Sequence, residues 1–233
     1  MPKSLPVEKL NAALMKEMFH AISPRYDFIT RVFSYGMDPR WKRQAVERAG
    51  LAPDATVLDL ACGTGDFSRL IEERHCAARP VAADLTFNML RLARRNGVAR
   101  ATCANAMRLP FPDQTFDAIF VGYGLRNFPE LAAALIEMRR VLKPGGRLVS
   151  LDFFLPENLV FRRLYLGYLY VQGFLWGLLL HGRPRIYTYI ADSLSSFVSM
   201  EVYGELLRRC GYTLTEARGF LLGGIAVHWA ART

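Results

Sequence analysis

Short apolar runs alternate with amphipathic stretches through the middle of the chain. Apolar runs of strand length occupy residues 57–60, 80–84, 101–104, 116–121 and 147–153. Three stretches between them repeat apolar side chains at helical spacing, at residues 66–74, 88–95 and 131–142. The last of these stretches ends at a Lys-Pro-Gly-Gly turn over residues 143–146. Strands that alternate with helices predict a doubly wound α/β fold with a parallel sheet.

The two ends of the chain depart from this alternation. Residues 8–50 have the pattern of helices that precede the sheet, and residues 155–195 form an insertion after the fifth strand. Residues 200–210 have helical spacing and end at a glycine, while residues 213–218 and 224–230 resemble a terminal strand pair. We therefore expect seven strands, mostly parallel, with an antiparallel terminal strand.

A glycine-rich turn, Cys-Gly-Thr-Gly at residues 62–65, joins the first strand to the first helix of the sheet. Such a turn usually holds a nucleotide at a helix N-terminus. The dinucleotide fingerprint needs a third glycine, where this chain has a serine, and Asp66 would repel a pyrophosphate. The sulfonium and ammonium of S-adenosylmethionine instead suit carboxylates at Asp59 and Asp66. Gly63 and Gly65 would let the backbone approach this ligand closely.

Two further polar positions follow the next strands. Asp84 ends the second strand, 21 residues after Gly63, and can accept both ribose hydroxyls. Taken alone, this spacing also fits a dinucleotide site. Asn105 and Ala106 follow the third strand and can reach the adenine edge. The whole ordered set favours S-adenosylmethionine as the cofactor.

Several stretches also carry the pattern of a known family. They are YDFITRVFSYGMDPRW, VLDLACGTGDF, AADLTFNML, ANAMRLPFPDQTFDAIF, RVLKPGGRLVSLDF and the closing GGIAVHWA. The most specific parts are the Tyr26-Asp27 pair and the GLRN tetrapeptide of residues 124–127. In these stretches the chain resembles the UbiE/MenG quinone C-methyltransferases over nearly its whole length. The resemblance implies methyl transfer to a ring carbon of a prenylated hydroquinol, either demethylmenaquinol or a ubiquinone precursor.

The same resemblance implies a Rossmann-like class I methyltransferase fold in one domain. Its parts would be an N-terminal helical cap (1–50), an S-adenosylmethionine-binding core (51–154), an apolar substrate lid (155–195) and a closing helix with strands (196–233). By the resemblance, five residues would contact the cofactor: Thr64, Asp84, Asn105, Ala106 and Gly122.

The chain departs from the family pattern at a few positions. The family usually has Asn where this chain has Thr30, and His where it has Asp38. It has a Glu and a Ser where this chain has Asp152 and Phe154, and its counterpart of residues 164–180 is less apolar. These departures leave the cofactor motifs intact. They therefore affect the identity of the methyl acceptor more than the methyl-transfer reaction.

Methylation of a quinol carbon requires a group that stabilises the phenolate or takes its proton. Arg126 and Asn127 follow the fourth strand at the edge where such sheets bind ligands. Arg126 could hold the phenolate or a water, and its alternative role is an ion pair that fixes a loop. Tyr26 could cover the cofactor or cap a helix. Asp152, at the end of the fifth strand, could accept a proton or orient Arg126.

Composition narrows the partners. The formal charge of +9 suggests anionic lipid or nucleic acid as a neighbour, although a merely basic protein fits too. GYGLRN stands where methyltransferases of exocyclic amines carry an (N/D)PP(Y/F) turn, and no aromatic-basic repeat suits base stacking, so nucleic acid is disfavoured. A phospholipid N-methyltransferase is the nearest alternative, and a non-catalytic binding protein is another class. The four cysteines form no CxxC pair and are typical of reduced thiols, which predicts a cytoplasmic protein. The cysteines and histidines have no metal-ligand spacing, so no metal is expected.

Residues 164–180 contain no charged side chain. Seventeen helical residues span roughly 25 Å, against a hydrocarbon core of about 30 Å. A span here would also separate the terminal strands from the sheet. Aromatic side chains and flanking arginines instead predict a lid that lines the acceptor tunnel and rests peripherally on the inner face of the membrane. The alternative is that this helix belongs only to the core. The sequence does not fix the oligomeric state, and a homodimer is one possibility.

Overall fold

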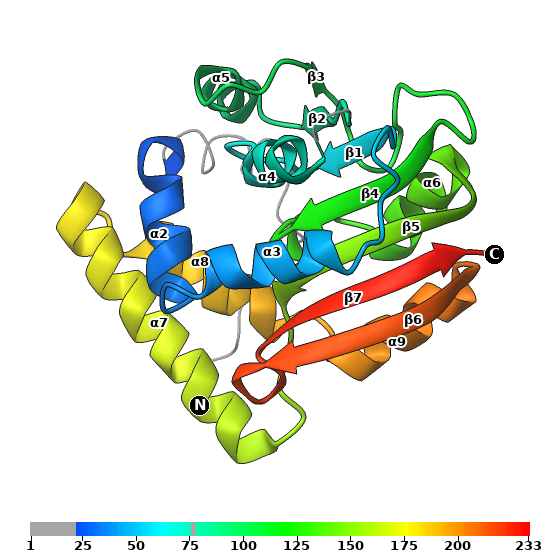
Figure 1. Ribbon diagram of the computed structural model, residues 1–233. Helices are drawn as coiled ribbons and strands as arrows, with labels where there is room; N and C mark the ends of the chain where they lie inside the picture. Colours follow the sequence, from blue (N-terminus) through cyan, green and yellow to red (C-terminus); the bar gives the residue numbers. More distant parts are fainter. Residues whose placement is uncertain (1–21, 76–77) are drawn as a thin grey trace.

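The computed structural model describes residues 22–75 and 78–233, so the first part of the predicted cap lies outside the described residues. Seven strands form one sheet in the order β3-β2-β1-β4-β5-β7-β6 (Figure 1). They are β1 (Val57–Leu60), β2 (Val81–Asp84), β3 (Ala101–Cys103), β4 (Phe116–Gly122), β5 (Leu142–Phe153), β6 (Tyr212–Phe220) and β7 (Ile225–Arg232). Strands β1 to β5 pair in parallel, and β7 is antiparallel to both of its neighbours. The predicted sheet is confirmed.

Helices cover both faces of the sheet (Figure 1). They are α2 (Tyr26–Phe33), α3 (Asp38–Glu47), α4 (Asp66–Arg74), α5 (Phe87–Arg95), α6 (Leu131–Val141), α7 (Leu159–His181), α8 (Arg185–Ser195) and α9 (Met200–Arg209), with short 3-10 turns η1 (Ser23–Arg25), η2 (Leu125–Asn127) and η3 (Leu221–Gly223). Helices α3, α4, α7 and α8 share one apolar core with one face of the sheet, and α6 and α9 share a second core with the other. Alternate residues of β4 therefore enter different cores: Phe120 faces the first, and Ile119 faces the second.

The strand order reverses between β1 and β4. From β1 the chain moves outward to β2 and β3, then returns to β4 on the other side of β1. The carboxyl ends of β1 and β4 therefore diverge into a crevice, which is where open α/β sheets bind ligands.

The turn predicted over residues 143–146 lies inside strand β5. Pairing with β4 jumps from Phe116–Leu142 to Ala118–Arg147, so the residues between bulge out of the ladder. Gly145 has φ of 72°, a conformation that favours glycine. The Pro-Gly-Gly sequence thus makes a bulge rather than a separate turn before the strand.

Helices α7 and α8 form the insertion after β5 and pack against each other. Gly173 and Gly177 of α7 are buried at this contact. A Cβ atom at Gly173 would lie 2.7 Å from the Tyr187 carbonyl oxygen, and one at Gly177 would lie 2.6 Å from that of Pro184. The two glycines therefore permit a close approach of the helix backbones.

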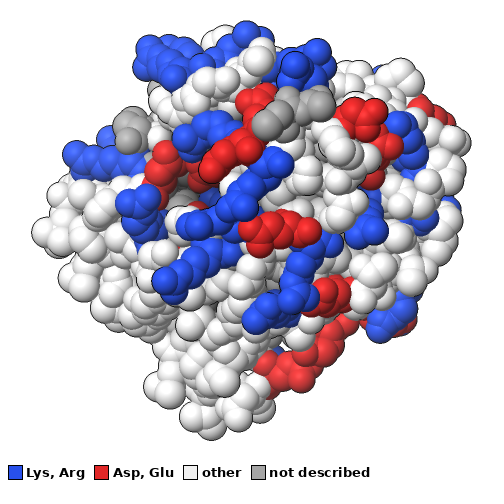
Figure 2. All heavy atoms as spheres, in the orientation of Figure 1, with Lys and Arg blue, Asp and Glu red and all other residues white. Residues whose placement is uncertain are grey.

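The solvent-exposed part of α7, which we name its outer face, is mostly apolar. Nine large side chains on it are between 41% and 72% exposed: Leu159, Val160, Leu164, Tyr170, Val171, Phe174, Leu175, Leu178 and Leu179. Figure 2 shows no cluster of charged side chains over the part of the surface that α7 forms. Within residues 22–75 and 78–233, no helix has both the length and the hydropathy needed to cross a bilayer.

Candidate functional site

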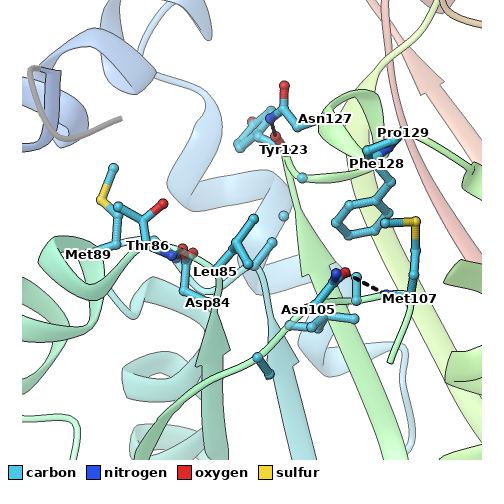
Figure 3. A pocket seen from close by; sticks show the side chains of 17 residues that line it. Asp84, Leu85, Thr86, Met89, Asn105, Met107, Tyr123, Asn127, Phe128 and Pro129 are labelled. Atoms are coloured by element: carbon cyan, nitrogen blue, oxygen red, sulfur yellow. Dashed lines mark hydrogen bonds between the residues drawn. The ribbon is translucent and has the colours of Figure 1, made fainter. Parts of the chain in front are cut away.

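A cavity of about 880 Å³ lies at the carboxyl ends of β1, β2 and β4 and opens to solvent. Figure 3 shows Asp84, Thr86 and Met89 on one side of it and Asn105, Met107 and Phe128 on the other. Five predicted cofactor residues line this cavity: Gly63, Asp84, Asn105, Ala106 and Gly122. We call it the nucleoside cavity, because its acceptor at Asp84 and its apolar walls suit a ribose and a purine.

Asp84 is held rigidly at the wall of the nucleoside cavity. Its carboxylate accepts hydrogen bonds from the backbone N–H groups of Gly63 at 3.0 Å and of Thr86 at 2.8 Å. Burial raises the pKa of Asp84, although these N–H groups act in the opposite direction. A carboxylate can accept about four hydrogen bonds, so this one retains capacity for ribose hydroxyls.

The glycines of the turn have different roles. Gly63 lines the nucleoside cavity and has φ of 53°. Gly65 has φ of 85° and lines none of the cavities, and a Cβ there would lie 2.4 Å from Cγ2 of Val98. Packing against the segment that follows α5 therefore constrains Gly65, and its contact with the ligand stays a prediction. Gly122 is similarly constrained, since its Cβ would lie 2.8 Å from Phe67.

A second cavity of about 300 Å³ adjoins the first, and Ala61, Gly122 and Tyr123 line both. Asp59, Thr64 and Asp66 also line this one, as does Lys42. Asp59 accepts hydrogen bonds from the backbone N–H of Ser68 at 2.9 Å and from its hydroxyl at 2.7 Å. Because it gathers ionisable groups, we name this space the charged cavity.

Cofactor affinity should depend on the protonation of Asp59. Burial raises the pKa of Asp59 to about 7, although Ser68 and Lys42 act against this rise. A cationic ligand favours the ionised carboxylate, so binding should strengthen by up to about tenfold as the pH rises from 6 to 8, with release of protons. Calorimetry in buffers of different ionisation enthalpy measures both effects. The Asp59→Asn variant should lose the pH dependence, and a flat profile in the wild type would contradict the assignment.

The N-terminal cap is tied to the glycine turn. The Thr64 hydroxyl donates to the Asp27 carboxylate at 2.6 Å. Asp27 lies in the first turn of α2, so this bond fixes α2 above the ligand loop. The side chain of Tyr26 is outside the described parts of the structure, and its role stays a prediction.

A third cavity of about 370 Å³ lies between α2, α8 and the ends of β4 and β5. We call it the acceptor cavity, because its walls would suit the aromatic acceptor that the sequence predicts. Its wall is mostly apolar and aromatic: Ile22, Ile29, Thr30, Phe33, Tyr123, Arg126, Phe153, Tyr187, Tyr189 and Ile190. Tyr123 lines this cavity and both of the others, so the three spaces meet at this residue. No residue of α7 lines the acceptor cavity; within the insertion, α8 supplies its wall.

Arg126 is placed in the acceptor cavity by a buried ion pair. Its Nε donates to Asp152 at 2.7 Å, and one terminal nitrogen donates to the Ser193 hydroxyl at 3.0 Å. Asp152 also accepts from the backbone N–H groups of Leu125 and Phe153, each at 2.8 Å. The side chains of Arg126 and Asp152 are 3% and 0% exposed. Asp152 lines none of these three cavities, and its ion pair fits the predicted role of orienting Arg126, while its role as a proton acceptor stays a prediction.

Arg126 and Asn127 face different spaces. Asn127 lines the nucleoside cavity, and its amide donates a long hydrogen bond of 3.5 Å to the Tyr123 carbonyl. Sequence reasoning missed Lys42 and the α8 residues Tyr187 and Tyr189. Lys42 stands among several basic residues without a distinguishing motif, and the apolar spacing of α8 is that of any packed helix.

Similarity to known proteins extends over nearly the whole chain. The model of the ubiE/COQ5 methyltransferase family matches residues 7–232. The chain belongs to this family. The ubiquinone/menaquinone biosynthesis C-methyltransferase UbiE of Desulfotalea psychrophila is 38% identical over 229 residues, which cover 94% of this chain and 90% of that one. The demethylmenaquinone methyltransferase of Thermus thermophilus is 40% identical over 203 residues, covering 84% and 92%.

Solved structures match the fold. A methyltransferase from Thermotoga maritima is similar with a TM-score of 0.66 and 20% identity, covering 93% of this chain and 99% of that one. The [4+2]-cyclase SpnF reaches a TM-score of 0.69 at 18% identity, covering 95% and 96%. A cyclase and a methyltransferase thus share this fold, and the family membership, not the fold, identifies the activity. This family member is an S-adenosylmethionine-dependent methyltransferase.

The cavities fit that cofactor. The nucleoside cavity offers Asp84 for ribose, and the charged cavity offers opposite charges for an amino-acid end. In the described parts of the chain, no group of three His, Cys, Asp or Glu side chains is arranged to hold a metal ion.

Proposed function

We propose that this family member methylates a ring carbon of a prenylated hydroquinol in quinone biosynthesis. The acceptor would be demethylmenaquinol or a ubiquinone precursor, as the names of the relatives suggest. The observation that carries the proposal is Arg126, a buried cation in a mostly apolar and aromatic cavity that meets the cofactor cavities at Tyr123. An aromatic cavity with one fixed cation suits a quinol ring whose hydroxyl must become anionic.

Arg126 would make the quinol ring nucleophilic in the acceptor cavity. The bound cofactor supplies the methyl group as an electrophile. Arg126 lowers the pKa of the adjacent quinol hydroxyl by stabilising its phenolate, and water takes the proton because a guanidinium is too weak a base. The electron pair of the phenolate makes the neighbouring ring carbon nucleophilic. The new C–C bond would replace the S–CH3 bond of the cofactor, whose electron pair would stay on sulfur as a neutral thioether. The methylated ring carbon would then lose its proton to water, and the ring would become aromatic again.

Cells that lack this protein test the proposal. They should accumulate the demethylated quinone, and a plasmid copy of the wild-type gene should restore the methylated one, as measured by mass spectrometry of extracted quinones. An unchanged quinone profile in the deletion strain would contradict the proposal.

An N-methyltransferase acting on phospholipid is the alternative. It would use the same cofactor cavities and a lipid-facing surface. Its acceptor amine would be cationic in part, and the Arg126 guanidinium in the acceptor cavity would repel it. The quinol fits the charge of this cavity better.

We also propose that the outer face of α7 rests on the membrane that contains the acceptor. This face is apolar over most of a 23-residue helix. Exposed Arg163 lies near its start and exposed Arg183 follows its end, which suits anionic headgroups on either side of an apolar strip. Behind α7, helix α8 lines the acceptor cavity, so a protein resting on α7 holds that cavity close to the bilayer.

Charges on this face should separate lipid-borne from soluble acceptors. We expect the double variant Leu164→Glu/Val171→Glu to lower activity on a long-tailed quinol in anionic vesicles by at least about tenfold, since two apolar contacts with the lipid are lost. Activity on a short-tailed soluble quinol should change less than twofold. The matched control is Ile136→Glu on α6, where an equally exposed apolar residue lies on another face.

Vesicle sedimentation and size-exclusion chromatography complete the test. The double variant should no longer sediment with vesicles. If the wild type elutes as a dimer and this variant as a monomer, the outer face is an interface between two copies, and the membrane proposal is wrong.

A further inference from the structure

Lys42 is the buried cation of the charged cavity. Its side chain is 9% exposed, and its ammonium donates to Asp38 at 2.8 Å and to Asp66 at 2.7 Å. It comes from α3, whereas Asp66 begins α4. Burial alone would lower the pKa of Lys42, but the two carboxylates raise it, so the residue stays charged.

The charged cavity contains both signs of charge. Lys42 lines it together with Asp59 and Asp66, and it shares walls with the nucleoside cavity at Ala61 and Gly122. A ligand whose nucleoside occupies the first cavity therefore has its other end in the second. For S-adenosylmethionine, that end is a zwitterion with one ammonium and one carboxylate.

We propose that Lys42 binds the carboxylate of the amino-acid end of S-adenosylmethionine, while Asp59 lies on the side of its ammonium. An ammonium group has three donors, and within the described residues the Lys42 hydrogen bonds are those to Asp38 and Asp66. The third donor is therefore available to a ligand. The inference depends on the cofactor and not on the identity of the acceptor.

Asp38 is a positioning residue in this arrangement. It stands where the family usually has His, and its carboxylate holds Lys42 from the start of α3. Its second oxygen, Oδ1, is buried and has no hydrogen-bond partner among the described residues. A buried carboxylate with one unpartnered oxygen is costly unless a cation stays beside it. Asp38 thus keeps Lys42 charged and fixed before the ligand arrives.

Decarboxylated S-adenosylmethionine provides a direct probe, since it lacks only the carboxylate. Calorimetry without any acceptor should show that the wild type binds S-adenosylmethionine about 10- to 100-fold more tightly than this analogue, the range of one hydrogen bond between charged groups. In Lys42→Met the ratio should fall to about one or below. The Lys143→Met variant, which removes a half-exposed lysine paired with Asp117, should keep the wild-type ratio.

A second variant guards against a folding defect. Lys42→Met leaves two carboxylates without their cation, so Lys42→Met/Asp38→Asn removes one of them, and Asp66 keeps its ion pair with Arg69. The ratio should collapse in this variant too, through loss of affinity for S-adenosylmethionine and not for the analogue. A wild-type ratio in the double variant, or an equal loss of both ligands, would overturn the proposal and make Lys42 a structural cation. Both outcomes stand apart from any failure to methylate quinols.

Discussion

Replacing Arg126 with Met should lower kcat about 100- to 1,000-fold and leave the cofactor Kd within threefold of the wild type. This is the effect expected for removing one fixed charge that stabilises a developing anion. Cofactor affinity should persist because Arg126 lines only the acceptor cavity. Steady-state kinetics with a soluble quinol and calorimetry with the cofactor give the two values.

The buried ion pair requires a control for folding. Removing Arg126 leaves the fully buried Asp152 carboxylate without its cation, which typically costs about 3–5 kcal/mol of stability. The double variant Arg126→Met/Asp152→Asn removes the stranded charge and should recover much of the lost Tm. It should not recover turnover. If turnover returns together with Tm, Arg126 acts only by holding η2 in place.

Asp84→Asn should weaken cofactor binding about 100-fold or more without unfolding the protein. The substitution removes the charged acceptor of two hydrogen bonds from ribose hydroxyls, each of which contributes about 1.5–3 kcal/mol to binding. The amide keeps an oxygen for only one of the N–H groups of Gly63 and Thr86, and this loss opposes the gain from removing a charge whose burial is unfavourable, as the raised pKa of Asp84 indicates. The Tm should therefore change little.

Calorimetry and thermal unfolding of the same samples check this result. The exposed Asp54→Asn is the matched control and should bind the cofactor as the wild type does. Normal binding by Asp84→Asn would move the ribose away from β2 and contradict the assignment of the nucleoside cavity.

The sheet and the cofactor residues could be predicted from local sequence. Runs such as residues 116–121 are apolar on both faces because helices cover the sheet on both sides. The turn at residues 62–65 and the carboxylate of Asp84 follow successive strands, and parallel strands bring their carboxyl ends to one edge. Residues at the ends of successive strands in the sequence therefore lie together at one edge of the sheet.

The acceptor cavity could not be predicted in this way. Arg126 meets Ser193 across 67 residues of sequence, and Lys42 meets Asp66 across 24. Such contacts depend on how α3 and α8 dock on the sheet, which no local pattern specifies. The apolar run of residues 164–180 predicts a wall of the acceptor tunnel, yet no residue of α7 lines the acceptor cavity, and Gly173 and Gly177 pack against α8 instead. Apolar periodicity reports that a helix face is buried or lipid-facing, but not which neighbour covers it.

Transfer of a labelled methyl group in a purified system would show which atom of which acceptor this protein methylates. The protein, S-adenosylmethionine with a ¹³C-methyl group and a reduced demethylated naphthoquinol or benzoquinol would be incubated, and the product examined by NMR and mass spectrometry. We expect one labelled methyl group on a ring carbon, with loss of the ring proton at that carbon. A methyl group on oxygen, or labelling of a phospholipid amine but of no quinol, would contradict the proposed function.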